Sequence, residues 1–394
     1  MFKADPSRPD RGPAYGSVLL AFVSLGVAVG SWGSRIPDVK ANLELSEGAL
    51  GTALLGLSLG AVAGSWIGGA LVHRFGSRVV ISRSWLAAGV LMVGPGLAGS
   101  WLVLATTALA AGLAIGILDV SMNGAGVQLE KAATSPLLNS LHAGWSGGIL
   151  LGSGVGAAAV ALGLSPGPHL AVVAVGIAAA SRTVAADLPD GTIAAAGLAD
   201  DPDPDHDPAT ASGSPRTGQL VALAVIAGCV FLGDGALLDW AGVFIREDLD
   251  GGPIIGALAV TGLSAGGLVG RLAGDRLAVR WGPAPYLRRG VLVASVAMAG
   301  VLVTPVAATV PVLLFGVGLG LAPAIPLAFA TAGHLWGERG IAVVTTAGYG
   351  SYLTGPAVIG GLAHATTLRT ALVVSLVLIV AVLPLAWSTE IEQP

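Results

Sequence analysis

The sequence predicts an all-α integral membrane protein, with twelve transmembrane helices arranged as two pseudo-symmetric six-helix halves. Three observations support this fold class: an apolar composition, apolar runs of helix length, and a glycine and arginine pattern that occurs twice. Of the 394 residues, 54% are hydrophobic and only 11% are charged. A soluble domain carries about 25% charged residues, so this chain has too few charges to cover a water-facing surface.

Apolar runs follow one another along the chain, each close to the length of about 20 residues that a spanning helix needs. Six lie before the middle, at 15–35, 48–72, 79–99, 101–128, 137–162 and 168–186. Six more lie after it, at 218–245, 253–273, 287–306, 309–332, 341–362 and 370–388. The first run is longer than the apolar core of a signal peptide, so we expect it to remain in the protein.

Polar stretches divide the chain into five parts. We expect an N-terminal tail at 1–14, a six-helix bundle at 15–186, a linker at 187–217, a second bundle at 218–388 and a C-terminal tail at 389–394. The linker contains "DPDPDHDP", in which prolines remove backbone donors and aspartates repel one another, so we expect it to be solvated and disordered. Nothing beside His206 in this stretch fixes a ligand geometry, and no metal site is expected.

The basic residues indicate the orientation of the twelve predicted spans. With the N-terminus inside, fifteen of the 19 basic residues fall on the inner side, and only Arg35, Lys40, Arg246 and Arg369 fall outside. Cytoplasmic loops carry an excess of lysine and arginine. We therefore expect both termini and the linker to be cytoplasmic, in a multi-pass protein of the plasma or inner membrane.

The second helix of each predicted half carries the same pattern. "GLSLGAVAG" begins at Gly56, and "GLSAGGLVG" begins at Gly262, 206 positions later. Arg74 and Gly76 recur at the same offset as Arg280 and Gly282. Glycines every four residues form a stripe on which another helix backbone can pack closely. Because the glycine stripe and the arginine-containing loop recur at the same offset, the pattern favours a duplicated six-helix unit. This is the architecture of alternating-access transporters.

Three polar residues share one face of the fourth predicted span. At about 100° per residue, Asn123 lies about 40° from Asp119, and Glu130 returns to within about 20° of it. A carboxylate in hydrocarbon is costly, so this face should meet a partner or a water-filled cavity. Glu130 is expected to reach the solvated edge. Asp119 lies deeper, where it could serve transport or pair with a neighbouring helix.

Other candidate binding residues lie in apolar runs on three further spans. The fifth span presents Asn139, His142 and Trp145 on one face, where His142 could titrate or act as a neutral donor. Asp234 and Asp239 of the seventh span are about 140° apart, so we expect only one of them to face a central cavity. The tryptophans Trp32, Trp145 and Trp240 could stack on a ligand or anchor a membrane interface.

The ends of the two repeated helices resemble the loop signature Gly-x-x-x-Asp-Arg-x-Gly-Arg-Arg of the major facilitator superfamily. The two stretches are "GALVHRFGSR", from Gly69 to Arg78, and "GRLAGDRLAVRWG", from Gly270 to Gly282. The resemblance implies a gating role for these loops, which contain Arg74, Gly76, Arg78, Asp275, Arg276 and Arg280. His73 stands where the signature has aspartate, so the first loop departs from it.

Within that superfamily, "DVSMN" and "NSLHAGWSGG" resemble the fourth and fifth helices of the fucose-permease branch, and more closely its YbjJ-type relatives. The resemblance implies that Asp119 couples transport to protons and that Asn123 lines the cavity. The second acid of the branch would fall near Gly33 and is absent. The chain offers Arg35 nearby instead, in "WGSRIPDVK", which argues against fucose as the substrate.

We therefore expect a secondary active transporter, not an enzyme, that moves a small polar solute such as a sugar or organic metabolite with protons. An exporter of drugs or metabolites in the same fold and a non-transporting membrane sensor are the alternatives. The sequence has no nucleotide-binding motif. We expect no cofactor, no metal and no nucleic-acid partner, and a monomer whose partners are the solute, protons and the bilayer.

Overall fold

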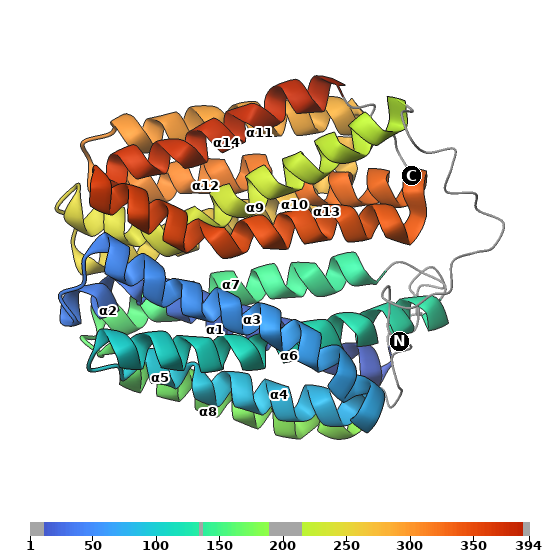
Figure 1. Ribbon diagram of the computed structural model, residues 1–394, viewed down its shortest axis with the longest axis horizontal. Coiled ribbons are helices and arrows are strands. Elements are labelled where there is room, and N and C mark those ends of the chain that lie inside the picture. The colour runs from blue at the N-terminus through green and yellow to red at the C-terminus, as the bar shows by residue number, and fades with distance from the viewer. Residues whose placement is uncertain (1–11, 134–136, 189–214, 389–394) are drawn as a thin grey trace, which may run out of the picture. The chain divides into compact units, whose positions relative to one another are not determined.

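The computed structural model describes residues 12–133, 137–188 and 215–388, and within these ranges the chain forms helices joined by short turns (Figure 1). Before the linker the elements are α1 (Pro13–Gly33), α2 (Ile36–Asn42), α3 (Glu47–Phe75), α4 (Ser77–Leu91), α5 (Val93–Gly96), α6 (Trp101–Ala133), α7 (Leu138–Ala161), α8 (Pro166–Val184) and the 3₁₀ turn η1 (Ala185–Asp187). After it come α9 (Pro215–Glu247), α10 (Pro253–Trp281), α11 (Pro283–Val303), the 3₁₀ turn η3 (Ala307–Thr309), α12 (Val310–Leu321), α13 (Ala324–Ala365) and α14 (Leu368–Ser388). The predicted linker, with His206, lies mostly outside the described residues.

The helices agree with the predicted membrane spans. Ten segments within the described ranges are long and apolar enough to cross a bilayer. With α8 and the part of α13 beyond Gly337, they account for the twelve predicted spans. Gly337 has φ 60° and ψ −147°, so α13 contains two helices joined at this glycine. The tenth predicted span is itself interrupted, because α12 ends at Leu321 and α13 begins at Ala324.

The chain forms two compact units whose boundary is not the one that the sequence suggests. The first unit contains residues 1–35 and 56–196, and the second contains residues 36–55 and 197–394. Thus α2 and the first turns of α3 pack with the second-half helices, while the rest of α3 packs with the first half. The sequence division at the linker places residues 36–55 in the first bundle instead.

The repeated glycines form close helix–helix seams in both units. A Cβ added to Gly60 or Gly64 would collide with the backbone of α6, at the carbonyl oxygens of Leu109 and Leu113. In the second unit, Gly266 meets the carbonyl oxygen of Phe315 on α12 in the same way. Backbones can approach this closely only where side chains are absent. The repeated stretches therefore hold corresponding helix pairs together, α3 with α6 and α10 with α12.

The two basic loops are much shorter than the sequence suggested, because α3 and α10 continue to Phe75 and Trp281. Each helix is followed by one glycine in the left-handed region: Gly76 has φ 80° and ψ 154°, and Gly282 has φ 84° and ψ 151°. This conformation favours glycine, which lacks a Cβ. The matching angles extend the internal repeat from the sequence to the backbone geometry.

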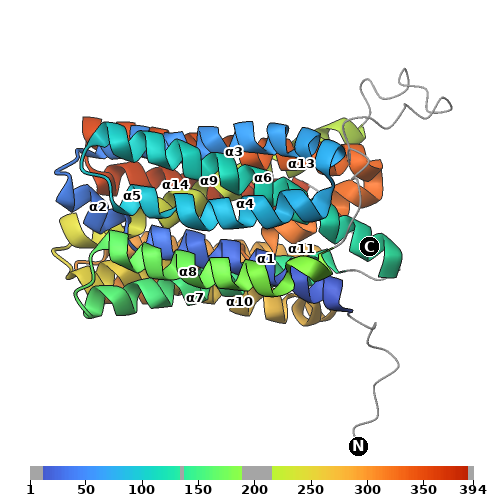
Figure 2. The same ribbon diagram turned by 90° about the horizontal axis from the view of Figure 1, so that it is seen from below.

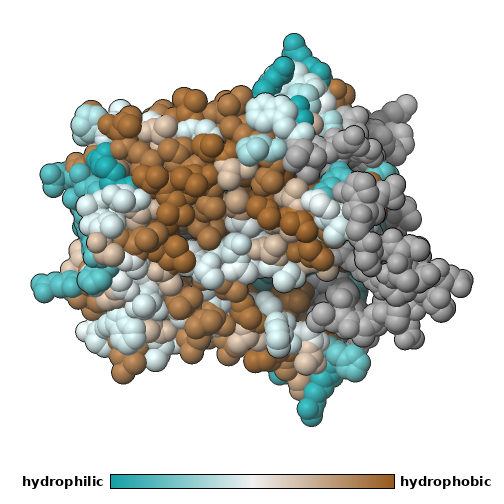
Figure 3. Space-filling model, turned by 45° about the horizontal axis from the view of Figure 1, so that its top comes forward, coloured by the Kyte–Doolittle hydropathy of each residue, from teal (hydrophilic) through white to brown (hydrophobic). Residues whose placement is uncertain are grey.

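The surface is typical of a protein surrounded by lipid. Large apolar side chains are exposed along the helices, including Trp66 at 83% and Val279 at 78%. In the view of Figure 3, hydrophobic residues cover the middle of the face and hydrophilic residues gather towards the helix ends. Figure 2 shows that the long helices run along a common direction within each unit. An apolar belt of this kind is what a bilayer-spanning helix bundle requires.

Candidate transport site

The fourth predicted span, α6, carries the acidic pair that the sequence singles out. The Asn123 side-chain amide donates to the Asp119 carboxylate at 3.1 Å and to the Asp119 carbonyl oxygen at 2.9 Å. Both side chains are partly exposed, and Asp119 lies near the middle of the helix. An intramembrane carboxylate needs such a hydrogen-bond donor to offset the cost of leaving water. The pair is therefore a local polar site within an apolar helix.

Glu130, on the same helix, has a partner that the sequence did not reveal. Its Oε2 atom accepts hydrogen bonds from the backbone N–H groups of Leu137 and Leu138, at 2.6 and 2.9 Å. These donors lie at the start of α7, where the first N–H groups of a helix have no partner within the helix. Glu130 thus caps α7 from the end of α6, which corrects the expectation that it would simply be solvated at the edge.

The face of α7 with Asn139, His142 and Trp145 is described in part. The His142 ring is exposed and packs edge-on against Phe22 of α1, with ring centroids 5.2 Å apart. Trp145 is partly exposed, and the side chain of Asn139 lies outside the described residues. The side chains of His142 and Trp145 are therefore both at least partly accessible. Their proposed contact with a solute stays a prediction.

The candidates at the end of α1 are enclosed by protein. Arg35 is 1% exposed and donates through its guanidinium to the carbonyl oxygen of Leu164, in the turn between α7 and α8. The Trp32 indole is 3% exposed. Arg35 therefore ties two chain segments of the first unit together, and a substrate could reach either side chain only after a rearrangement of this end.

In the second unit, Asp234 and Asp239 lie near the middle of α9 and are both partly exposed. Tyr352 of α13 lies close to this stretch, since a Cβ on Gly235 would lie 2.6 Å from its ring. Trp240, which follows Asp239, is fully buried. The helical offset between the two aspartates is retained, because α9 is continuous through both. Which of them faces a solute remains a prediction.

Arg271 is a further functional candidate. The sequence alone indicates only that it is one of the fifteen basic residues on the inner side. It lies within a helical segment that could span a membrane, Pro253–Gly274, and its side chain is exposed. Arg271 interacts electrostatically with Asp234 on the neighbouring helix α9. An arginine inside an apolar run is the sequence signal that could have identified it. Arg271 and Asp234 thus place opposite charges within the membrane-spanning helices of one unit.

The basic residues expected to form gating loops belong mostly to helix ends. Arg74 is in the last turn of α3, where its guanidinium lies 5.3 Å from the Phe75 ring centroid. Arg78 is in the first turn of α4 and donates to the carbonyl oxygen of Leu188 at 3.0 Å. Arg276 and Arg280 are exposed on the last turns of α10, and the side chain of Asp275 lies outside the described residues. Basic side chains near a helix C-terminus are favoured by its dipole.

Comparison with known proteins gives the family. Residues 14–356 match the model of the Major Facilitator Superfamily. The chain belongs to this family. Membership agrees with the helical architecture, the apolar surface and the internal repeat. The chain is therefore a multi-pass membrane protein of a transporter family.

Three relatives of this superfamily member cover almost all of it. An uncharacterized transporter, y4wD, from Sinorhizobium fredii (strain NBRC 101917 / NGR234) is 30% identical over 372 residues, which is 92% of this chain and 93% of the relative. An uncharacterized MFS-type transporter from Yersinia pestis is 29% identical, over 90% of each chain. The membrane protein MosC from Rhizobium meliloti is 26% identical, over 90% of this chain and 85% of its own.

Solved structures with the same fold are more distant in sequence. The nucleoside transporter NupG superposes with a TM-score of 0.69 at 12% identity, covering 95% of this chain and 98% of the other. A bacterial homologue of the human lysosomal transporter Spinster, in an inward-facing and unoccupied conformation, gives a TM-score of 0.68 at 14% identity and covers 97% of each chain. At these identities the similarity shows the shared fold.

Proposed function

We propose that the chain transports a small polar solute, such as a sugar or organic metabolite, by proton-coupled alternating access. The observation that carries the proposal is the Asp119–Asn123 pair in the middle of α6, where the amide contacts the carboxylate at 3.1 Å. The apolar surroundings of a membrane-spanning helix disfavour the charged carboxylate. Asp119 can therefore take up a proton on one side and release it on the other, while Asn123 binds the solute beside it.

The polar residues of α9 and α10 support a second half-site. Asp234 and Arg271 bring opposite charges into the membrane-spanning helices, and Asp239 adds a second acid. Ionisable residues within such helices commonly mark ion and substrate pathways. We propose that one of the two aspartates, together with Arg271, contacts the solute from the second unit. His142 and Trp145 would contribute from the first unit, and Trp32, Arg35 and Trp240 would do so after a local rearrangement.

The positive-inside pattern supports a plasma- or inner-membrane location, with both termini in the cytoplasm. In this orientation, the last turns of α3 and α10 lie on the cytoplasmic side. Their arginines, Arg74 and Arg280, would then gate the inner opening. The end of the molecule that carries α2 would face outwards. Gly76 and Gly282, which follow these two helices with φ of 80° and 84°, support an equivalent role for the two arginines.

The proposal is tested by replacing Asp119, the proposed proton carrier. A thermal-shift screen of the purified protein against sugars, organic acids and antibiotics first identifies a ligand, because binding to the folded state raises the apparent stability. Asp119→Asn then mimics the permanently protonated side chain. In proteoliposomes, we expect the variant to lose proton-driven accumulation of that ligand but to keep binding and passive exchange.

Ser121→Ala is the matched control, because Ser121 lies on the same turn of α6 but is buried and bonded to its own helix. It should accumulate the ligand as the wild type does. Uphill accumulation by Asp119→Asn, with an unchanged pH dependence, would exclude Asp119 and transfer the proton-carrying role to the acids of α9. Everted and right-side-out vesicles distinguish import from export in the same assay.

A further inference from the structure

Residues 36–55 are attached to the second unit by direct backbone packing. A Cβ on Gly51 of α3 would lie 2.6 Å from the carbonyl oxygen of Pro356, and one on Gly360 would lie 2.9 Å from the Cα of Gly51. α2 packs against α9, where a Cβ on Gly242 would lie 2.9 Å from the Pro37 ring. The start of α3 thus meets the backbone of α13 directly, and α2 meets α9 through the Pro37 ring.

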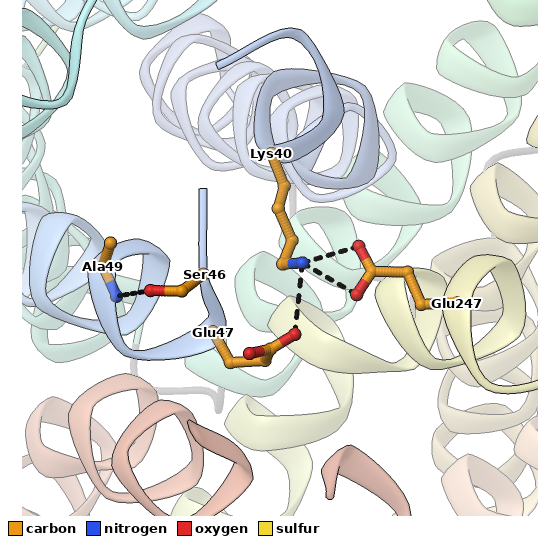
Figure 4. A network of polar contacts seen from close by, with 5 residues as sticks. All are labelled: Lys40, Ser46, Glu47, Ala49 and Glu247. Carbon is orange, nitrogen blue, oxygen red and sulfur yellow. Dashed lines mark hydrogen bonds and ion pairs between the residues drawn. The ribbon is translucent and has the colours of Figure 1, made fainter. Parts of the chain in front are cut away.

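Lys40 of α2 holds this attachment electrostatically. Its Nζ atom lies 2.7 Å from both carboxylate oxygens of Glu247, at the end of α9, and 3.3 Å from Oε1 of Glu47, at the start of α3 (Figure 4). The lysine side chain is only 8% exposed. A buried ammonium group needs nearby carboxylates, and removing one partner of such a pair leaves a costly unpaired charge.

A second ion pair joins the same two helices. Arg246 of α9 pairs with Asp38 of α2. Each helix therefore supplies one acid and one base: α2 gives Asp38 and Lys40, while α9 gives Arg246 and Glu247. A shift of α2 along α9 would oppose like charges, which is unfavourable and helps to fix one register.

Further charged groups lie at this end of the second unit. Arg369 of α14 donates to the carbonyl oxygen of Leu302, and its guanidinium lies 5.2 Å from the Phe244 ring centroid. Burial raises the pKa of the Asp248 carboxyl, although the nearby Arg369 acts in the opposite direction. His364 of α13 interacts with Glu47. Asp248 and His364 thus both interact with Glu47, one of the two acids that contact Lys40.

The attached segment is continuous with the first unit. α3 runs without interruption from Glu47 to Phe75, and its residues belong to the second unit up to Leu55 and to the first from Gly56. The glycine seam fixes the later part of α3 to α6. A movement of one unit against the other must therefore either bend α3 or detach residues 36–55 from α9 and α13.

We propose that the two ion pairs Lys40–Glu247 and Asp38–Arg246 form a latch, which holds residues 36–55 on the second unit and releases them when the transporter opens at this end. The inference rests on the proposed alternating access. It assigns a gating role to four residues outside the candidate solute site. The latch is made of charges, so its opening is expected to depend on those charges rather than on apolar packing.

Electron–electron double resonance on the full-length protein in nanodiscs tests the latch. Spin labels are attached at Thr52→Cys on α3 and Val312→Cys on α12, in a Cys229→Ala background; both positions are exposed and both belong to the second unit. The parent protein should give one dominant distance. Lys40→Gln should add a second, longer component, because residues 36–55 detach in part of the population.

Two controls make the outcome specific. Glu44→Gln removes an exposed charge from the same segment and should leave the distances unchanged. Asp38→Arg and Arg246→Asp should each add the longer component, and the double variant, which restores an ion pair in reverse, should reduce it. The latch is refuted if Lys40→Gln keeps the parent distribution, or if the double variant opens as far as the single variants.

The latch and the proposed transport can fail separately. The distance measurement needs neither a solute nor a proton gradient. A charge-dependent longer component in a protein that accumulates no solute would support the latch and remove the transport proposal. Solute transport by the protein, with the parent distance kept in every variant, would support the transport proposal and refute the latch.

Discussion

Glu130 shows how one side chain can join two successive helices. The carboxylate at the end of α6 accepts from the first two amides of the next helical segment, at Leu137 and Leu138. A carboxylate at a helix N-terminus is favoured both by hydrogen bonding and by the helix dipole. The residue therefore has a structural role, although it shares a helical face with Asp119.

We expect Glu130→Ala to destabilise the start of α7. The loss of a helix cap costs about 1 kcal/mol, so the apparent melting temperature should fall slightly. Hydrogen exchange at Leu137 and Leu138 should become faster. Glu130→Gln keeps an acceptor but loses the charge, so its exchange rates should lie between those of Glu130→Ala and the wild type. If Glu130→Ala protects these amides as well as the wild type does, the carboxylate is not their cap.

Helical periodicity is enough to predict contacts between residues one turn apart. Asp119 and Asn123 share a face because of this spacing, and their hydrogen bond follows from it. Periodicity does not say which distant residues meet. The interaction of Arg271 with Asp234 and the contacts of Lys40 with Glu247 depend on the packing of different helices, so the sequence contains no direct sign of them.

Among the helices, α9 carries two acids on different faces. Asp234 and Asp239 are about 140° apart on a continuous helix, and both are partly exposed. We predict that only one of them lines the solute pathway. Single cysteines at the two positions, in a Cys229-free background, should react at different rates with a small water-soluble thiol reagent. Equal and rapid labelling of both would contradict the prediction.

The positions of the spans could be predicted because each is a long apolar run, and most predicted limits lie within a few residues of the helix ends. The exceptions have physical causes. α3 and α10 extend further because basic side chains are favourable in the last turn of a helix. The short helix α2 has no long apolar run, and its contacts with α9 come from the Pro37 ring and from the ion pairs of Asp38 and Lys40.

For the whole molecule, the duplicated helix ends suggest a difference between the two inner gates. Gly76 and Gly282 have nearly the same backbone angles, but the sequence around them differs: Asp275 precedes the arginines of the second copy, whereas His73 occupies the corresponding place in the first. An acid close to the arginines can hold them by charge. We therefore predict that Arg280 matters more to gating than Arg74.

The comparison is made with Arg280→Ala and Arg74→Ala in the same transport assay. The initial rate should fall further in the Arg280 variant, while both variants reach the membrane in equal amounts. Arg83→Ala serves as a control, because it removes an exposed positive charge that belongs to neither loop. A loss of transport in the Arg74 variant alone would reverse the order.

The crossing of α3 between the units also has a consequence for biosynthesis. Residues 36–55 leave the ribosome long before α9 and α13, so their docking surface does not yet exist when they are made. The second unit can be completed only when this early segment is captured by late helices. A fragment that begins at Pro215 would contain Arg246 and Glu247 but neither of their α2 partners. The second compact unit is therefore not encoded by one continuous stretch of sequence, and its completion brings residues 36–55 together with α9 and α13.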